Sequence, residues 1–411
     1  MIFWWILYIV DVLLFVPVLL TVMYFLVFSF ASLGKHRNEY KKAKEQNRFI
    51  VIIPSYKNDK VIYKTVNSIL GQNYPQRLFD VVVISDHQSE LINMRLAQLP
   101  ITLLTPDFEK SSKAKSLQYA VLNLPKFKIY DAVLILDAGN IVKPEFLDEV
   151  NNAYVTSGTK AIQTHRLSAN RETPAARLDS IFEEINNAIF RRGHQVLGLS
   201  AALNGSGIVF DYQWFKTNIM RVRSAEGEDK AIEALLARDN IFVDYFEDIY
   251  VYDEKVHDMK QFNSQHARWI HTQLHSLISN LRFLPEALIN RRYDLADKIF
   301  QWLLVPRTIL MGIITVMSLV LPFIYMTLAF KWWVIAALIL FAFSLATPDY
   351  LVDKNWDNDF MHSPKIIFGG ISNFFRAGSH ETAVRASLVK NQLSSLKGLI
   401  KKRNGNKRRR R

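Results

Sequence analysis

From Met1 to Leu33 the chain is apolar almost without interruption, and this run limits its structure more than any other feature. Asp11 is the only charged residue in the run. The run is longer than the roughly 20 residues that cross a bilayer as a helix, and it lacks the basic start of a cleavable signal peptide. We therefore expect a transmembrane helix over residues 1–34, the alternative being a helix buried in a protein core.

Two more apolar runs, "TILMGIITVMSLVLPFIYMTLAF" and "WWVIAALILFAFSLA", follow Arg307. A short connection around Lys331 joins them, which is typical of two antiparallel helices. We place this transmembrane hairpin at residues 304–350. Here too the alternative is a pair of buried core helices. Together the three runs predict a multi-pass membrane protein.

Basic residues predict how the chain is oriented. The segment "GKHRNEYKKAK" follows the first apolar run directly, and the chain ends in "KKRNGNKRRRR". Lys and Arg gather on the cytoplasmic side of membrane spans. We therefore expect Met1 on the outside. The middle of the chain and the segment 351–411 with its polybasic tail are expected in the cytoplasm, at the cell (inner) membrane.

Composition excludes some classes of site. None of the 411 residues is a cysteine, which rules out disulfides, thiolate metal sites and a cysteine nucleophile. The formal net charge is +13, a balance that favours anionic partners such as phosphorylated substrates, anionic lipids or nucleic acid. Much of this charge lies in the tail. A solvated tail needs only local contacts with anions, so the total charge says little about the rest of the chain. A membrane-tethered nucleic-acid binder is supported by the tail alone, and we do not expect nucleic acid as a partner.

Short apolar segments alternate with helical patterns in the middle of the chain. "RFIVIIPSY", "FDVVVISDHQS", "ITLLTP" and "DAVLILDAG" have the character of buried strands, and "KVIYKTVNSILGQ" and "KAKSLQYAVLNL" have helical spacing. This alternation predicts an α/β fold, a mostly parallel sheet with helices on both faces. Ligands bind beyond the carboxyl ends of such strands. Polar clusters follow three of these strands, at residues 55–59, 85–87 and 137–140.

Seven segments resemble the motifs of glycosyltransferase family 2. They are "VIIPSYKND", "SILGQNYP", "KAKSLQYA", "LILDAGN", "LNGSGIVF", "GEDK" and "QHARW", and they occur in the family's order within residues 48–310. The last one fits the pattern Gln-x-x-Arg-Trp, which is typical of cellulose, chitin and hyaluronan synthases and of glucosylceramide-type glucosyltransferases. The resemblance implies a cytoplasmic GT-A domain at residues 45–270. It also implies a nucleotide-sugar donor, which we expect to be a UDP-sugar.

The resemblance assigns roles to individual residues. It implies donor binding by Pro54, Tyr56, Asp59, Asp86, Lys113, Asp137 and Arg268. It implies catalysis by Asp229 as general base with Glu228 beside it, and acceptor contacts from Gln265, Trp269, Gly205 and Gly207. Simpler roles stay open: Asp86 as a turn residue, Lys113 as a solvated helix residue, and the two acids as favourable charges at a helix N-terminus.

The family's Asp-x-Asp motif is incomplete here. Asp137 is present, but Gly139 stands where the second carboxylate is usual. The resemblance implies a divalent cation, Mg²⁺ or Mn²⁺, held by Asp137 with the donor diphosphate, and Asn140 is a candidate additional ligand. The missing carboxylate leaves open a catalytically inactive family member that acts as a partner subunit or nucleotide-sugar sensor. A separate histidine metal site, from His257, His266, His271 and His275, is not expected, because no carboxylate recurs at ligand spacing.

The amphipathic segment 271–303 precedes the hairpin, and we expect it to form interfacial helices on the membrane. The sequence thus predicts an inverting glycosyltransferase of polysaccharide or glycolipid biosynthesis. Three spans are few for a polymer channel within one chain. We therefore expect a lipid-linked or glycan acceptor, and partner subunits if a polymer is made.

Overall fold

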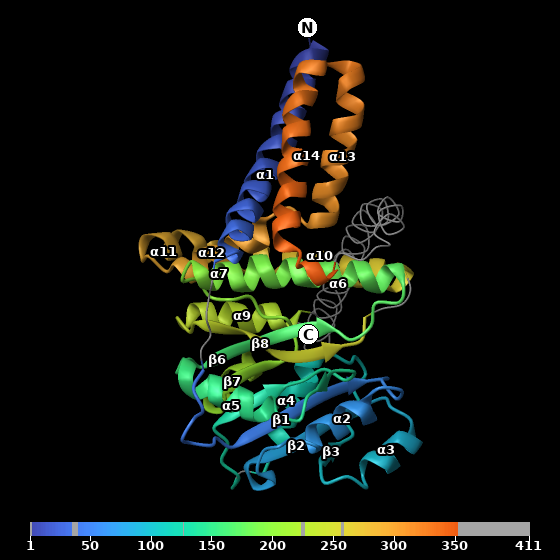
Figure 1. The fold of residues 1–411 in the computed structure, drawn as a ribbon, viewed down its shortest axis with the longest axis vertical. Helices are drawn as coiled ribbons and strands as arrows, with labels where there is room; N and C mark the ends of the chain where they lie inside the picture. The colour runs from blue at the N-terminus through green and yellow to red at the C-terminus, as the bar shows by residue number, and fades with distance from the viewer. Residues whose placement is uncertain (1, 35–39, 126, 223–226, 256–258, 352–411) are drawn as a thin grey trace, which may run out of the picture.

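The chain folds into a helical bundle standing on an α/β domain. The computed structural model describes residues 2–34, 40–125, 127–222, 227–255 and 259–351. Figure 1 shows three layers: the upright apolar helices at one end, a band of roughly horizontal helices beneath them, and the sheet with its flanking helices at the other end.

One sheet forms the centre of the α/β domain. Its strands lie in the order β3-β2-β1-β4-β7-β6-β8-β5. β1 to β4 pair in parallel, β7 runs antiparallel to both its neighbours, and β6 pairs in parallel with β8. The strands span Phe49–Tyr56 (β1), Phe79–Asp86 (β2), Thr102–Leu104 (β3), Ala132–Ile135 (β4), Ile141–Val142 (β5), Ala161–Ser168 (β6), Ile208–Asp211 (β7) and Val243–Asp253 (β8).

Helices cover both faces of this sheet. Along β1, Ile50 and Ile52 belong to one apolar core and Val51 and Ile53 to the other, all with no exposed surface. One core is completed by α4 (Lys113–Asn123), α8 (Tyr212–Asn218) and α9 (Glu228–Arg238), and the other by α2 (Ile62–Leu70), α3 (Glu90–Leu96) and α5 (Phe146–Ser157). Successive strand residues point to opposite faces, so burial on both sides explains the continuous apolar runs in the sequence. The predicted α/β fold is confirmed.

Three helices are long and apolar enough to cross a membrane within the part of the chain that is described. They are α1 (Ile2–Ser32), α13 (Arg307–Ile324) and α14 (Met326–Ala346). The single acid of the first run, Asp11, is buried among them. Its carboxylate accepts hydrogen bonds from the Lys331 ammonium and from Trp332 Nε1 on α14, the latter at 2.8 Å. Pairing compensates a charge that a bare apolar helix would not tolerate.

The last turns of α1 leave the bundle and enter the α/β domain. The amide of Val305, just before α13 begins, donates to Thr21 Oγ1 at 3.1 Å, so α1 beyond Thr21 extends past the start of the hairpin. There Phe28 stacks on the ring of His194 with centroids 3.8 Å apart. His194 lies on α7 (Gly193–Val196), which follows the long helix α6 (Pro174–Asn187). This contact sets the domain against the bundle.

The horizontal band holds α6, α10 (Met259–Asn280), α11 (Leu284–Ile289) and α12 (Tyr293–Leu303) (Figure 1). α12 is amphipathic: Leu295, Ile299 and Trp302 are buried, whereas Tyr293 and Leu303 are exposed. α10 runs without a break through residue 270, so the predicted boundary between residues 270 and 271 falls inside one helix. The predicted segment 351–411 lies almost entirely outside the described residues.

We expect Gly193→Ala to destabilise the protein. A Cβ at Gly193 would lie 2.4 Å from the carbonyl oxygen of Phe28, which is backbone and cannot turn aside. Helix propensity alone would favour alanine by about 1 kcal/mol, whereas overpacking costs about 1–3 kcal/mol. Chemical unfolding in micelles measures the net change in the free energy of unfolding. Gly71→Ala, where the nearest atom is 3.3 Å away, is the control. Equal or greater stability of Gly193→Ala would contradict this docking contact.

Candidate active site

A lysine ammonium is surrounded by oxygen atoms beyond the end of β4. Lys113 Nζ donates to Asp137 Oδ1 at 2.5 Å and to the Gly205 carbonyl oxygen at 2.6 Å, and Glu228 Oε1 lies 3.6 Å away. The lysine side chain is 19% exposed and that of Asp137 31%. Four sequence-predicted residues from different parts of the chain therefore meet at one point.

Local structure places each member of this group. Lys113 is the first residue of α4, whose N-terminus is capped by Ser112 Oγ accepting from the Lys115 amide. Asp137 follows β4 in a turn in which the Asn140 amide donates to the Asp137 carbonyl at 3.1 Å. Gly139 in this turn has φ +105°. A residue with a side chain is strained at that φ. Glycine therefore suits this turn better than the second carboxylate of the Asp-x-Asp pattern would.

Asn140 supports the turn from inside. It is fully buried; its Oδ1 accepts from the Asp137 amide at 3.2 Å and from Ser206 Oγ, and its Nδ2 donates to Asp253 Oδ1 at 2.8 Å. Both ends of the side chain are thus engaged within the protein. Ser206 was not singled out in the sequence, although it lies inside the quoted segment "LNGSGIVF".

The loop of Gly205 and Gly207 closes over the end of β4. Both glycines have positive φ, and the Gly207 amide donates to the Ile135 carbonyl at 2.9 Å. A Cβ at Gly207 would lie 2.3 Å from Thr164 Oγ1. This close approach is what requires glycine at position 207, and it brings the Gly205 carbonyl to the Lys113 ammonium.

The charges of the group are mutually dependent. Burial lowers the pKa of the Lys113 ammonium, but Asp137 and Glu228 outweigh this effect and hold the pKa above its ordinary value. Burial raises the pKa of Glu228, Asp229 adds to the rise, and Lys113 opposes it. Lys113 is therefore a permanent cation that keeps two neighbouring carboxylates together.

A second polar group lies where β1 and β2 end. Tyr56 and Asp86 are paired in the parallel register of these strands. Asp86 is 1% exposed; its Oδ1 lies 2.5 Å from His87 Nδ1, and its Oδ2 has no hydrogen-bond partner among the described residues. A buried carboxylate oxygen without a partner is costly unless a ligand supplies a donor. Asp59 nearby accepts from the Ser89 amide at 3.2 Å, and Pro54 lies buried within β1.

The acids Glu228 and Asp229 begin α9, as the sequence predicted. Gly227 precedes them with φ +74°, and a Cβ there would lie 1.9 Å from Thr272 Cγ2 of α10. α10 therefore crosses directly over the start of α9. Gln265 and Arg268 lie on the same face of α10 as Thr272, because the spacings are three and four residues. Trp269 is 41% exposed and packs edge-on against His266.

Buried ion pairs connect α9 to the horizontal band. Glu233 is 1% exposed and lies between two lysines, with Lys230 Nζ at 2.9 Å and Lys298 Nζ of α12 at 3.1 Å. Burial raises the pKa of Glu233, but the two lysines outweigh it and hold this pKa below its usual range. Nothing in the sequence spacing indicates the partner on α12, since Lys298 is distant along the chain.

The residues of α10 are not bonded to the Lys113 group. No hydrogen bond or ion pair joins Gln265, Arg268 or Trp269 to Lys113 within the described ranges. These ranges also contain no group of three or more His, Asp or Glu side chains placed to hold a metal. Burial, with a smaller effect of Arg307, lowers the pKa of His266 to about 3, so this histidine is neutral. His257 lies outside the described residues.

Comparison with solved structures finds similar folds. The mannosyltransferase PcManGT from Pyrobaculum calidifontis, solved in complex with GDP-Man and Mn²⁺, has 13% identity and a TM-score of 0.53, with 89% of this chain and 97% of that chain covered. A structure of S. aureus TarS with UDP-GlcNAc has 17% identity and a TM-score of 0.44, covering 82% of this chain and 92% of that one. At 13% identity the first likeness shows the fold alone. No curated protein matches the sequence.

The sequence itself matches a family. The profile described as "Glycosyltransferase like family 2" aligns with residues 46–272. This stretch contains the whole sheet, the Lys113 group and the first half of α10. Because the match covers more than half of the 411 residues, the chain belongs to the glycosyltransferase family 2-like family.

Proposed function

We propose that the protein is an inverting glycosyltransferase of the Gln-x-x-Arg-Trp branch. It transfers a sugar from a nucleotide-sugar donor, a UDP-sugar in this proposal, to a lipid-linked or glycan acceptor at the cytoplasmic membrane face. The observation that carries the proposal is the convergence of Lys113, Asp137, Gly205 and Glu228 beside Asp229, at the carboxyl edge of the sheet. This is where α/β sheets bind nucleotides.

The donor fits the groups along this edge. Asp86 Oδ2 is buried and has no hydrogen-bond partner in the described part of the chain, so it suits a hydroxyl or N–H donor of the base or ribose. Tyr56, exposed beside it, offers a ring face, and Asp59 lies at the same strand ends. Lys113 offers a positive charge to the diphosphate. Arg268 supplies a second cation from α10, in charge-assisted bonds to the leaving group.

A divalent cation is compatible with the donor set, although the residues for it are few. Three protein oxygens already surround one cation, the Lys113 ammonium, and carboxylate and carbonyl oxygens are the ligands that Mg²⁺ and Mn²⁺ prefer. Asp137 would hold the ion, which would neutralise charge on the diphosphate. Asn140 is less suited, because Asp137 N and Ser206 Oγ already donate to its oxygen. PcManGT, solved with GDP-Man and Mn²⁺, supports this part of the proposal by its similar fold.

The chain's own residues account for the proton and the leaving group. Asp229 accepts the proton of the acceptor hydroxyl as its oxygen bonds to the anomeric carbon of the donor sugar. The bond from that carbon to the diphosphate breaks, and the nucleoside diphosphate leaves toward Lys113 and Arg268. Attack opposite to the leaving group inverts the configuration. Trp269 and Gln265 contact the acceptor sugar, by an apolar face and by hydrogen bonds.

A second candidate function is favoured by Gly139. In this alternative the protein binds a nucleotide sugar without turnover and acts as a sensor or partner subunit. Gly139 has a positive φ, so an aspartate at this position would be strained. Turnover of any nucleotide sugar by the purified chain in bilayers rejects this alternative, whereas donor binding without turnover supports it.

Asp229→Asn is expected to lower the transfer rate by about 10²–10⁴-fold, the usual contribution of a general base. The amide cannot accept the proton, but its size is unchanged, so donor affinity should stay within about twofold. Steady-state transfer and donor titration measure the two effects. Asp248→Asn, an exposed position on β8, is the matched control. A transfer rate within twofold of the wild-type rate would rule out this base.

Asp137→Ala is expected to abolish the metal dependence of donor binding together with activity. The reason is that Asp137 is the one carboxylate among the proposed protein ligands of the ion. Titration of Mn²⁺ against donor binding in the wild type and the variant measures this, with Asp248→Ala as control. If both proteins show the same Mn²⁺ dependence, Asp137 does not hold the ion.

Reporter tags at Met1 and Arg411 are expected on opposite sides of the membrane. Three spans are an odd number, and the basic segments after the first span and at the tail face the cytoplasm in this proposal. Protease protection in sealed vesicles locates each tag, and a tag after Gly158, in the exposed turn between α5 and β6, should match Arg411. Finding both terminal tags on one side would contradict the three-span topology.

A further inference from the structure

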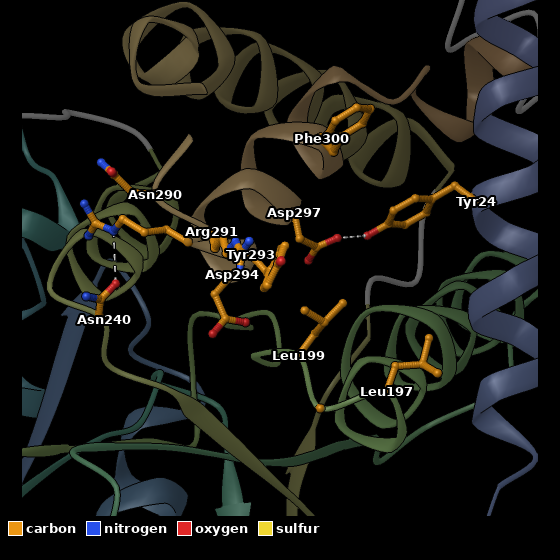
Figure 2. Close-up of a pocket in the computed structure, with 12 residues that line it drawn as sticks. Tyr24, Leu197, Leu199, Asn240, Asn290, Arg291, Tyr293, Asp294, Asp297 and Phe300 are labelled. Atoms are coloured by element: carbon orange, nitrogen blue, oxygen red, sulfur yellow. Dashed lines mark hydrogen bonds between the residues drawn. The ribbon is translucent and has the colours of Figure 1, made fainter. Parts of the chain in front are cut away.

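A cleft lies between three parts of the chain: the end of α1, the loop that follows α7, and α12 (Figure 2). None of its lining residues belongs to the group around Lys113. Its volume is about 840 Å³. It lies just beneath the start of the hairpin: Tyr24, which lines it, follows Thr21 by three residues, or about 4.5 Å along the helix, and Thr21 contacts the chain next to α13. With the bundle in a membrane, the cleft lies at headgroup depth.

The lining is polar at one end and mostly apolar at the other, where the Asp297 carboxylate is bonded to the Tyr24 hydroxyl. In Figure 2, Asn240 and Asn290 lie on the side away from α1, whereas Leu197, Leu199 and Tyr24 lie toward it. A pocket with two such ends matches an amphiphile better than a small ion or a sugar.

Most charged groups of the lining are already engaged. Asp297 accepts from Tyr24 and from Gln301, each at 2.7 Å, and Asp294 accepts from the Ser200 amide at 2.7 Å. The guanidinium of Arg292 donates to Asn240 Oδ1 at 3.1 Å and to the Arg238 carbonyl at the end of α9. These groups hold the walls together.

Arg291 is the exception. Its side chain is exposed and has no hydrogen bond or ion pair within the described part of the chain. Its backbone is left-handed, with φ 54°, a conformation that is costly for a residue with a side chain. The side-chain nitrogen of Asn240 and the side chain of Asn290 also have no hydrogen bond within the described residues. One cation and two amide donors suit a phosphate diester.

Exposed apolar side chains lie on the two helices beside the cleft. Ile289 is 79% exposed, Tyr293 65%, Leu303 51% and Phe300 43%, all on α11 and α12. Such side chains on an amphipathic helix insert among acyl chains. A soluble phosphate compound would make no use of them.

We propose that this cleft binds a glycerophospholipid, with its phosphate diester on Arg291, Asn240 and Asn290 and its acyl chains along Phe300 and α1. The bound lipid fills the space between α1 and α12 and so supports the seating of the α/β domain. This binding goes beyond glycosyl transfer and does not depend on it.

Native mass spectrometry of the full-length protein, purified in detergent with added phosphatidylglycerol, tests the proposal. We expect one retained lipid per chain and a raised midpoint of thermal unfolding. Arg291→Gln should weaken retention by about tenfold or more, the effect of losing one charge-assisted bond. Arg282→Gln is the control, since Arg282 is exposed in the turn just before α11 but does not line the cleft. Circular dichroism confirms that both variants fold.

Two further probes distinguish the source of the phosphate. Diacylglycerol with the same acyl chains should bind at least tenfold more weakly than phosphatidylglycerol, because it lacks the phosphate. Inorganic phosphate at the same concentration should not raise the unfolding midpoint. Equal retention of phosphatidylglycerol by Arg291→Gln and wild type overturns the proposal, and so does stabilisation by inorganic phosphate alone.

Discussion

The position of the α/β domain relative to the bundle depends on His194. This side chain is fully buried, stacks on Phe28 of α1, and has its Nδ1 2.6 Å from the Ile189 carbonyl. Its Nε2 lies 2.8 Å from the Tyr24 hydroxyl and 3.2 Å from an Asp297 oxygen. One imidazole thus joins a long apolar helix, a short helix of the α/β domain and an amphipathic helix. The close approach of α1 is possible because Gly193 has no side chain.

From this junction, contacts lead to the candidate active site. α12, anchored at Asp297, also carries Lys298, which pairs with Glu233 of α9, and Glu233 in turn holds Lys230 next to Asp229. Removing one partner of a buried ion pair costs about 3–5 kcal/mol, because it leaves an uncompensated charge. The start of α9 is therefore held by two helices of the horizontal band, through Lys298 of α12 and Thr272 of α10, in addition to the packing of α9 on the sheet.

At the sheet edge, one lysine pairs with two carboxylates. Lys113 lies between Asp137 and Glu228, offsets part of their negative charge, and donates to the Gly205 carbonyl. Two carboxylates so close together would otherwise repel each other and favour protonation. In the proposed donor complex, the diphosphate would compete for the same ammonium. Donor binding would then weaken the contact between Lys113 and Glu228.

Local sequence was sufficient for the features that depend on neighbouring residues. The apolar runs predicted the three helices that are long and apolar enough to cross a membrane. The alternation of strands and helices predicted β1, β2, β3, β4, α2 and α4 close to their observed bounds. The ordered motifs predicted which side chains lie at the carboxyl edge, because parallel strands bring their ends together. Lys113, Asp137, Gly205 and Glu228 did meet.

Long-range contacts were beyond such reasoning. Residue spacing does not indicate that β6 pairs with β8, or that α10 continues past residue 270. It also does not indicate that the side-chain amide of Asn140 is hydrogen-bonded to Ser206 and Asp253. Nor does it indicate the partner of Glu233 or the cleft under α12. Apolar periodicity reports which side of a segment is buried, because burial acts on each residue separately. Which segment lies against it depends on how many surfaces pack at once, and that is set only in the folded chain.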